Sequence, residues 1–281
     1  MSELIASYDE LDLVNVTIAN GIATTNISAP PINVMTRDLF AQLAKFGAKV
    51  AVDDDVRVVV LRSADPDFFI AHFDVSLITT FPSEGAPDKA TELGGFHLMC
   101  ETYRTMPKAT IAEIAGRVGG GGNELAMSCD MRFGALDKTV INQMEVPLGI
   151  LPGGTGTQRL PRLVGRGRAM EIILGGIDID AATAAEWGLL NRVLPADELS
   201  DHVDDLARRI AGYPPIAVAA AKRSVANADD LSLHDGMLEE AYLFQTTLRD
   251  PEAQRRMRLF TEVGGQTRDG ELNLMDTLDQ L

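Results

Sequence analysis

Four consecutive glycines stand directly before an isolated carboxylate in GRVGGGGNELAMSCD, residues 116–130. Glycine inside a regular element costs about 0.5–1 kcal/mol relative to alanine, so a run of four needs a reason. Between a buried strand and a helix, such a run lets a ligand approach backbone N–H groups, and the helix N-terminus adds unpaired donors. The stretch is therefore a candidate oxyanion site, and tight helix–strand packing is the alternative explanation.

The glycine run does not read as a nucleotide-phosphate loop, because it matches neither GxGxxG nor the P-loop pattern. Glu124 falls in the first turn of the expected helix, where a carboxylate could also simply complement the helix dipole. A second carboxylate, Glu145, closes an expected strand over 139–145 between the apolar residues Met144 and Val146. Burial there would raise its pKa and suit it to proton transfer; a surface charge at a strand end is the alternative.

The composition narrows the class of protein. The chain has 281 residues and 46% hydrophobic content, enough for a sizeable core, and its formal net charge is −16. So acidic a chain is a poor general binder of nucleic acid or of anionic membranes, so we expect neither as a partner. An anionic ligand could still bind at a local site.

Cysteine usage and the chain start are also informative. Cys100 and Cys129 form no CxxC pair and no Cys/His cluster, so we expect two buried free thiols and no metal site. The first residues are acidic and lack a basic segment followed by an apolar core, so no signal peptide is predicted. No run of 18 apolar residues occurs, so no membrane span is predicted, and we expect a cytoplasmic protein.

Strand and helix patterns alternate along the first two thirds of the chain. Asn20-Gly21 between two β-type runs predicts a hairpin, and Thr36 is the expected cap of a helix reaching about Val50. Further expected elements are buried strands over 56–64 and 109–118, a loop and short helix over 65–78, a helix ending before Pro107, strands over 131–136 and 139–145, and two helices within 151–176. From residue 180 the pattern is almost all helix. We therefore expect an α/β core over 1–195 and a helical region over 196–281.

Several ordered motifs resemble the enoyl-CoA hydratase/isomerase family, the crotonase superfamily. Residues 112–136, AEIAGRVGGGGNELAMSCDMRFGAL, resemble its central signature, and residues 141–165, INQMEVPLGILPGGTGTQRLPRLVG, resemble its second. Residues 63–78, SADPDFFIAHFDVSLI, resemble its first oxyanion segment. The likeness covers about residues 10–260. It implies a spiral of ββα units followed by a C-terminal helical trimerisation region.

The resemblance also implies a reaction and its residues. The substrate would be an acyl-CoA thioester whose oxygen is bound by the backbone N–H groups of Phe73 and Gly121. Glu124 would act as the base that helps water add to C3 of a trans-2-enoyl-CoA, and Glu145 would deliver a proton to C2. The product would be a 3-hydroxyacyl-CoA. No metal or redox cofactor is implied, and coenzyme A enters as part of the substrate.

Other matched residues would bind the substrate or support the site. Ala71, His72, Asp74 and Gly120 are the expected substrate-binding residues, with Asp74 in a structural role. His72 stands where the family usually has glycine, Phe73 replaces a small residue, and Asn123 stands where a small or apolar residue is common. Gln143 and Arg159 are expected to be structural.

The residues leave other functions open. Keeping both Glu124 and Glu145 favours a hydratase over an isomerase, hydrolase, decarboxylase or aromatic acyl-CoA lyase of the same superfamily. A CoA-binding subunit without turnover is a further alternative, with His72 and Phe73 as its signature. By resemblance the expected assembly is a homotrimer or a dimer of trimers.

Overall fold

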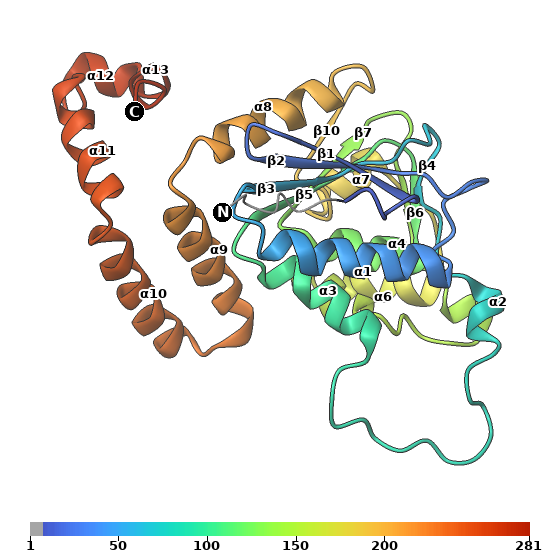
Figure 1. Ribbon diagram of the computed structural model, residues 1–281. Helices are drawn as coiled ribbons and strands as arrows, with labels where there is room; N and C mark the ends of the chain where they lie inside the picture. Colours follow the sequence, from blue (N-terminus) through green and yellow to red (C-terminus); the bar gives the residue numbers. More distant parts are fainter. Residues whose placement is uncertain (1–7) are drawn as a thin grey trace. The chain divides into compact units, whose positions relative to one another are not determined.

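The computed structural model describes residues 8–281 and contains two compact units, one ending at Gly212 and the other covering Tyr213–Leu281. The first unit has a six-stranded sheet in the order β1-β2-β3-β5-β7-β10. Its strands are β1 (Val14–Ala19), β2 (Ile22–Ile27), β3 (Val58–Leu61), β5 (Ala109–Ile114), β7 (Met131–Ala135) and β10 (Arg192–Leu194) (Figure 1). Only the β1–β2 pair is antiparallel in this sheet, and the remaining strands pair in parallel.

The predicted hairpin and first helix are confirmed. Asn20 and Gly21 have φ angles of 53° and 78°, the left-handed conformations that a tight two-residue hairpin turn requires. Helix α1 (Arg37–Ala51) begins after Thr36, whose hydroxyl accepts a hydrogen bond from the Leu39 N–H at 3.2 Å. The cap satisfies one of the helix's unpaired donors.

A second sheet runs beside the first and was missed in part by the sequence patterns. It contains β4 (Phe68–Ile70), β6 (Arg117–Gly119), β8 (Val140–Asn142) and β9 (Ile179–Asp180). The single strand predicted over 109–118 is divided between β5 in the large sheet and β6 in the small one, and a loop was predicted where β4 lies. An apolar run predicts that a segment is buried. It does not show where the chain leaves one sheet and enters another.

The two sheets give the repeated ββα unit that the family resemblance implied. Strand pairs β3–β4, β5–β6 and β7–β8 each place one strand in each sheet and lead into a helix. These pairs are followed by α2 (Val75–Ile78) and α3 (Gly95–Thr105), by α4 (Gly120–Ser128), and by η1 (Val146–Leu148), α5 (Gly156–Val164) and α6 (Arg166–Gly175). The last part of the unit adds α7 (Ala181–Glu186), as predicted, and the short strands β9 and β10, which the sequence patterns did not predict.

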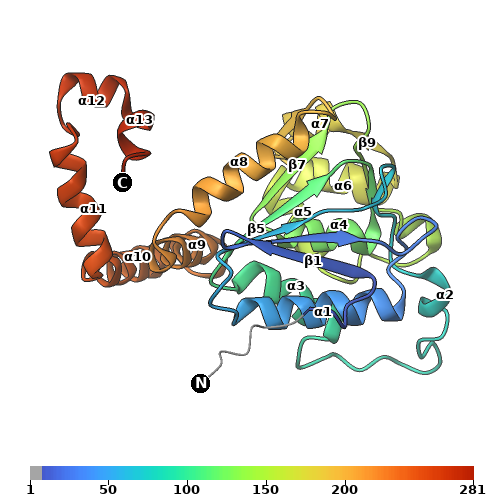
Figure 2. The ribbon, with the colours of Figure 1, turned by 45° about the horizontal axis from the view of Figure 1, so that its top comes forward.

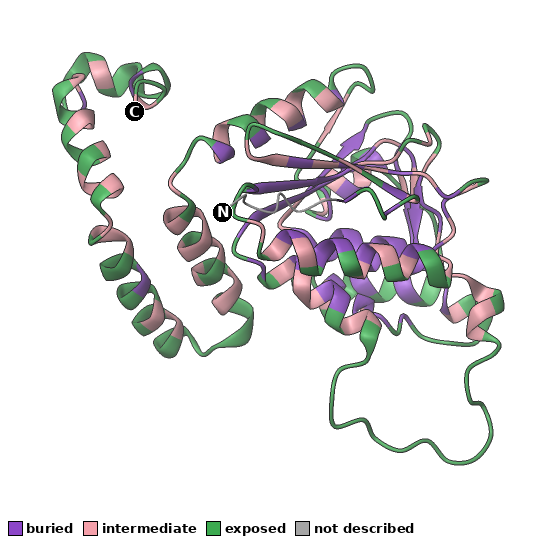
Figure 3. Ribbon diagram, in the orientation of Figure 1, coloured by how far each residue is buried: buried purple, intermediate pink, exposed green. Residues whose placement is uncertain are grey.

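Helix α4 occupies the centre of this unit. All of its residues are buried, and it contacts strands of both sheets, β4, β6, β7 and β8. Buried residues concentrate in α4 and the strands (Figure 3). A helix packed on all sides explains why its sequence is rich in small and apolar residues and why its one carboxylate, Glu124, needs hydrogen-bond partners.

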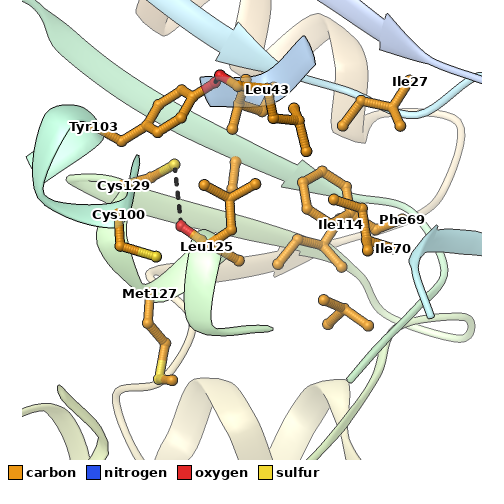
Figure 4. Packing of buried hydrophobic residues seen from close by; sticks show 14 of the residues in the cluster. Ile27, Leu43, Phe69, Ile70, Cys100, Tyr103, Ile114, Leu125, Met127 and Cys129 are labelled. Atoms are coloured by element: carbon orange, nitrogen blue, oxygen red, sulfur yellow. Dashed lines mark hydrogen bonds between the residues drawn. The ribbon is translucent and has the colours of Figure 1, made fainter. Parts of the chain in front are cut away.

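Both cysteines are buried free thiols in this core, as predicted. Cys129 follows α4 and its Sγ lies 3.8 Å from the Leu125 carbonyl oxygen, while Cys100 of α3 lies nearby (Figure 4). Burial raises the pKa of Cys100 to about 12, so it stays a thiol at neutral pH.

Helix α8 (Leu199–Ala211) belongs to the first unit, whereas the sequence patterns placed the boundary at residues 195 and 196. Its apolar face is buried, and it contacts β2, β3, β5 and β7 on the face of the sheet opposite α1 and α3 (Figures 1 and 2). Arg62 of the loop after β3 bridges Glu113 of β5 at 2.5 Å and Asp204 of α8 at 2.9 Å. These contacts depend on strands far away in sequence, so the helical pattern alone could not assign α8 to its unit.

The second unit is entirely helical, as predicted for the C-terminal region. Its helices are α9 (Pro215–Asp230), α10 (Leu233–Leu248), α11 (Pro251–Glu262), α12 (Arg268–Leu272) and α13 (Leu274–Leu278). Helices α9 and α10 pack against each other. Among the residues that the structure describes, no helix has the length and apolar character needed to cross a membrane.

Candidate active site

The glycine run lets the start of α4 lie directly against the chain that leaves β4. A Cβ atom on Gly122 would stand 2.4 Å from the Ile70 carbonyl oxygen, so no larger residue fits without moving the backbone. Gly120 has a φ angle of +45°, a conformation that residues with a side chain rarely adopt. The glycines therefore serve close packing, and this packing also brings the N-terminus of α4 to residues 70–73.

The two predicted oxyanion donors are neighbours. A Cβ built on Gly121 would lie 3.1 Å from the Phe73 Cβ. Gly121 is in the first turn of α4, where N–H groups have no partner within the helix. Met35 forms an isolated parallel bridge with Phe73, donating to the His72 carbonyl at 2.8 Å and accepting from the Asp74 N–H at 3.1 Å. In this pattern the N–H of Phe73 itself points away from Met35.

Glu124 is held by a clamp of three backbone amides, the N–H groups of Gly154, Thr155 and Gly156. They donate to its Oε1 atom at 2.9, 2.8 and 2.7 Å. Only 3% of Glu124 is exposed, so these bonds supply the donors that water would otherwise provide. They use one oxygen and leave Oε2 to act on another group.

The residues of this clamp were missed as site residues by the sequence patterns. The segment PGGTG was predicted only to open a helix, which it does at α5. Its glycines, like those before Glu124, stand directly before a helix N-terminus, and that shared signal could have identified a second group of backbone donors.

Glu145 lies just beyond β8, between Asn142 and η1, rather than inside the strand as predicted. It is 8% exposed, and its Oε2 accepts a hydrogen bond from Gln143 Nε2 at 3.2 Å. Burial, and then the negative charge of Glu124, raise the pKa of Glu145 to about 7. Glu145 is thus close to half protonated at neutral pH, as a group that gives and takes protons should be.

Gln143 is itself held by Asn123, the residue before Glu124. Asn123 Nδ2 donates to Gln143 Oε1 at 2.7 Å, and both side chains are fully buried. The structure thus connects the helix that carries Glu124 with the segment that carries Glu145. The sequence patterns treated Gln143 as structural and Asn123 only as an unusual residue.

The predicted binding residues Ala71, His72 and Asp74 lie in the segment after β4, next to Phe73. Ala71 is buried, and His72 Nδ1 lies 2.9 Å from the Phe73 carbonyl oxygen. Asp74 caps α2, accepting from the Ser76 N–H at 2.8 Å and the Ser76 hydroxyl at 2.6 Å. The Ser76 hydroxyl is the main group that lowers the pKa of Asp74. The geometry agrees with the structural role expected for Asp74.

The bulky Phe73 side chain joins two aromatic rings that the sequence patterns did not select. Phe73 packs edge-on against Phe96 of α3 with ring centroids 5.7 Å apart, and Phe96 stacks on Phe40 of α1 at 5.9 Å. The Phe96 ring also lies beside Gly121, 3.2 Å from a Cβ built there. Arg159 pairs with Glu101 at 2.6 Å, as expected for a structural residue.

The assembled site can bind a carbonyl oxygen and move protons. Phe73 and Gly121 offer adjacent backbone donors, and Glu124 and Glu145 offer two carboxyl groups in different environments. Within residues 8–281, no three His, Cys, Asp or Glu side chains are grouped as metal ligands would be.

Comparisons with known proteins identify the family of this chain. The model of the family "Enoyl-CoA hydratase/isomerase" matches residues 17–267. A protein of Mycobacterium leprae described as a "probable enoyl-CoA hydratase" is 31% identical over 86% of this chain and 91% of its own. The mitochondrial methylglutaconyl-CoA hydratase of Mus musculus is 32% identical over 87% of this chain and 79% of its own.

A solved structure shows the same fold. The crystal structure of enoyl-CoA hydratase from Bacillus anthracis superposes with a TM-score of 0.81 at 28% identity, covering 89% of this chain and 96% of that one. The chain belongs to the enoyl-CoA hydratase/isomerase family.

Proposed function

We propose that this protein catalyses the reversible addition of water to a trans-2-enoyl-CoA, giving a 3-hydroxyacyl-CoA. The observation that supports it best is the pair of carboxyl groups. Glu124 is oriented by three backbone donors, and Glu145 has a pKa of about 7. The hydratase relatives support the same reaction.

In the proposed reaction the N–H groups of Phe73 and Gly121 donate to the thioester oxygen. They stabilise the negative charge that develops on this oxygen and make C3 electrophilic. Residues 71–74 and Gly120 border the thioester. No electrons leave or enter the substrate, so we propose acid–base chemistry without a redox cofactor or metal.

The two glutamates divide the proton transfers. Glu124 Oε2 accepts a proton from water as the water oxygen bonds to C3, and Glu145 gives its proton to C2. The two carboxyl groups then exchange the proton, which restores the starting state.

Crotonyl-CoA tests this function directly. We expect the wild-type protein to remove the conjugated-enone absorbance of crotonyl-CoA and to form 3-hydroxybutyryl-CoA. We expect kcat/KM for hydration to fall as the pH rises through about 7, because Glu145 must be protonated to donate. Folded protein that leaves crotonyl-CoA unchanged, or that only creates enone absorbance from a 3-enoyl-CoA, would contradict the proposal.

We also propose that the chain forms a homotrimer or a dimer of trimers through its second unit. The proposed location is the cytoplasm. Among the large apolar side chains of the second unit, Leu243 is buried. By contrast, Leu233, Tyr242 and Phe244 are 81%, 63% and 60% exposed. Apolar surface of this extent on a helical unit favours association with further chains.

The mass in solution should be three or six times the chain mass of 30.3 kDa. Phe244→Asp should lower it, because a charge would be buried at the contact. Val52→Asp, at an apolar residue of the first unit that is 80% exposed, should leave the mass unchanged. A monomeric wild-type protein by light scattering would overturn the assembly.

A further inference from the structure

We propose that Asn123 is a positioning residue that, through Gln143, directs the transferable proton of Glu145 to its Oε1 atom. The inference rests on the proposed hydration and assigns a role to a residue outside the pair of carboxyl groups. Asn123 belongs to α4 and Gln143 to the segment after β8, so the contact joins two separate elements.

Two hydrogen bonds, from Asn123 to Gln143 and from Gln143 to Glu145, form the relay that we propose, and they fix how the amide group of Gln143 is oriented. Asn123 Nδ2 can only donate, so its 2.7 Å bond requires an acceptor, and Gln143 presents its oxygen there. The amide group of Gln143 is thereby turned so that Nε2 faces Glu145 Oε2 at 3.2 Å. An oxygen that accepts an N–H bond is the carbonyl-like oxygen of a carboxylic acid, so the acid proton belongs on Oε1.

Glu145 Oε1 is the oxygen that faces the candidate oxyanion site. It lies 2.9 Å from a Cβ built on Gly120, the residue beside the Gly121 donor. A proton on Oε1 is therefore placed at the start of α4, whereas a proton on Oε2 would point at the Nε2 donor of Gln143. Asn123 and Gln143 are both fully buried, so water cannot supply the orientation in their place.

Glu124 and His72 are titratable residues on the elements that border Glu145. Glu124 approaches from α4, and its charge raises the pKa of Glu145. His72 approaches from the segment after β4, with its Cβ 3.4 Å from the same Cβ built on Gly120. The Gln143 donor acts against the effect of Glu124, because it stabilises the ionised form of Glu145.

The test is the pH profile of hydration for Asn123→Leu. Without the Asn123 donor, Gln143 can turn its oxygen toward Glu145, which favours the protonated acid and places its proton on the wrong oxygen. We expect kcat at the optimum to fall about tenfold, KM to change little, and the alkaline limb of kcat/KM to move to higher pH. Asn123→Ala removes the same donor with a smaller side chain and should shift the limb in the same direction.

A double-mutant cycle separates this relay from a packing defect. Gln143→Met should reproduce the shift, and adding Asn123→Leu to it should move the limb no further, because Asn123 acts through Gln143.

Ser128→Ala is a control for a packing defect. It removes a buried hydrogen bond from the same helix, to the Glu124 carbonyl oxygen, and should leave the alkaline limb in place. In His72→Gln the alkaline limb of kcat/KM should stay at the same pH, which would assign this limb to Glu145 and not to His72. An unmoved limb in both Asn123 variants, or additive shifts in the cycle, would overturn the relay.

A measurement without substrate keeps this result distinct from failure of the proposed reaction. The carboxyl carbon of Glu145, assigned by its loss in Glu145→Gln, can be titrated by NMR in the free protein. We expect its pKa to rise in Asn123→Leu and in Gln143→Met. If the wild type fails to hydrate crotonyl-CoA and this pKa still rises, the proposed function fails and the relay stands; an unchanged pKa removes the relay.

Discussion

Replacing Glu124 with glutamine should lower kcat/KM for crotonyl-CoA hydration by about 10³-fold, within the range typical of a lost general base. The amide oxygen of glutamine can still accept the three bonds from residues 154–156. The amide nitrogen would then take the place of Oε2, and it cannot accept a proton from water. The variant therefore removes the base while keeping the clamp.

Glu113→Gln is the matched control for this variant. Glu113 is also 3% exposed, but it pairs with Arg62 and with Ser200 of α8, away from the candidate site. Folded Glu113→Gln should keep its activity per molecule, with the folded fraction measured by circular dichroism. Activity of Glu124→Gln within tenfold of the wild type, or an equal loss in folded Glu113→Gln, would contradict the role of Glu124.

Replacing Glu145 with glutamine should lower hydration by about 10²–10⁴-fold and also stabilise the protein at alkaline pH. The pKa of Glu145 is about 7 in the folded protein, against 4.5 for an exposed glutamate. Below pH 4.5 the group is protonated in both the folded and the unfolded chain and has no effect on stability. As the pH rises from 4.5 to 7, the unfolded chain ionises first, so the free energy of unfolding falls.

Above pH 7 the loss is complete and reaches about 3 kcal/mol, since each pKa unit corresponds to about 1.4 kcal/mol. Glutamine has no charge to bury, so Glu145→Gln should recover stability at pH 8 and gain little at pH 4.5. Urea unfolding at the two pH values measures this difference, with equal m-values as the check for a two-state comparison. A gain of the same size at both pH values, or a loss at pH 8, would show that Glu145 carries no burial penalty.

Features that depend on neighbours in the chain could be predicted from the sequence. The Asn20-Gly21 hairpin and the Thr36 cap depend on a few consecutive residues, and both are found. The glycines before Glu124 indicated an oxyanion site because a strand, a close turn and a helix start follow one another within a short segment. The same local order, extended over several motifs, was enough to identify the family.

The division into two sheets and the partners of each carboxyl group were decided only by the tertiary structure. Glu124 is clamped by amides 30 to 32 residues further along the chain, and Asn123 reaches Gln143 across 20 residues. Glu145 owes its raised pKa first to burial, which its apolar neighbours indicated, and then to the charge of Glu124, which only the tertiary structure places near it. Local patterns record which residues prefer to be buried or to turn. The path of the chain in space decides which buried polar groups meet, and through them which proton can move.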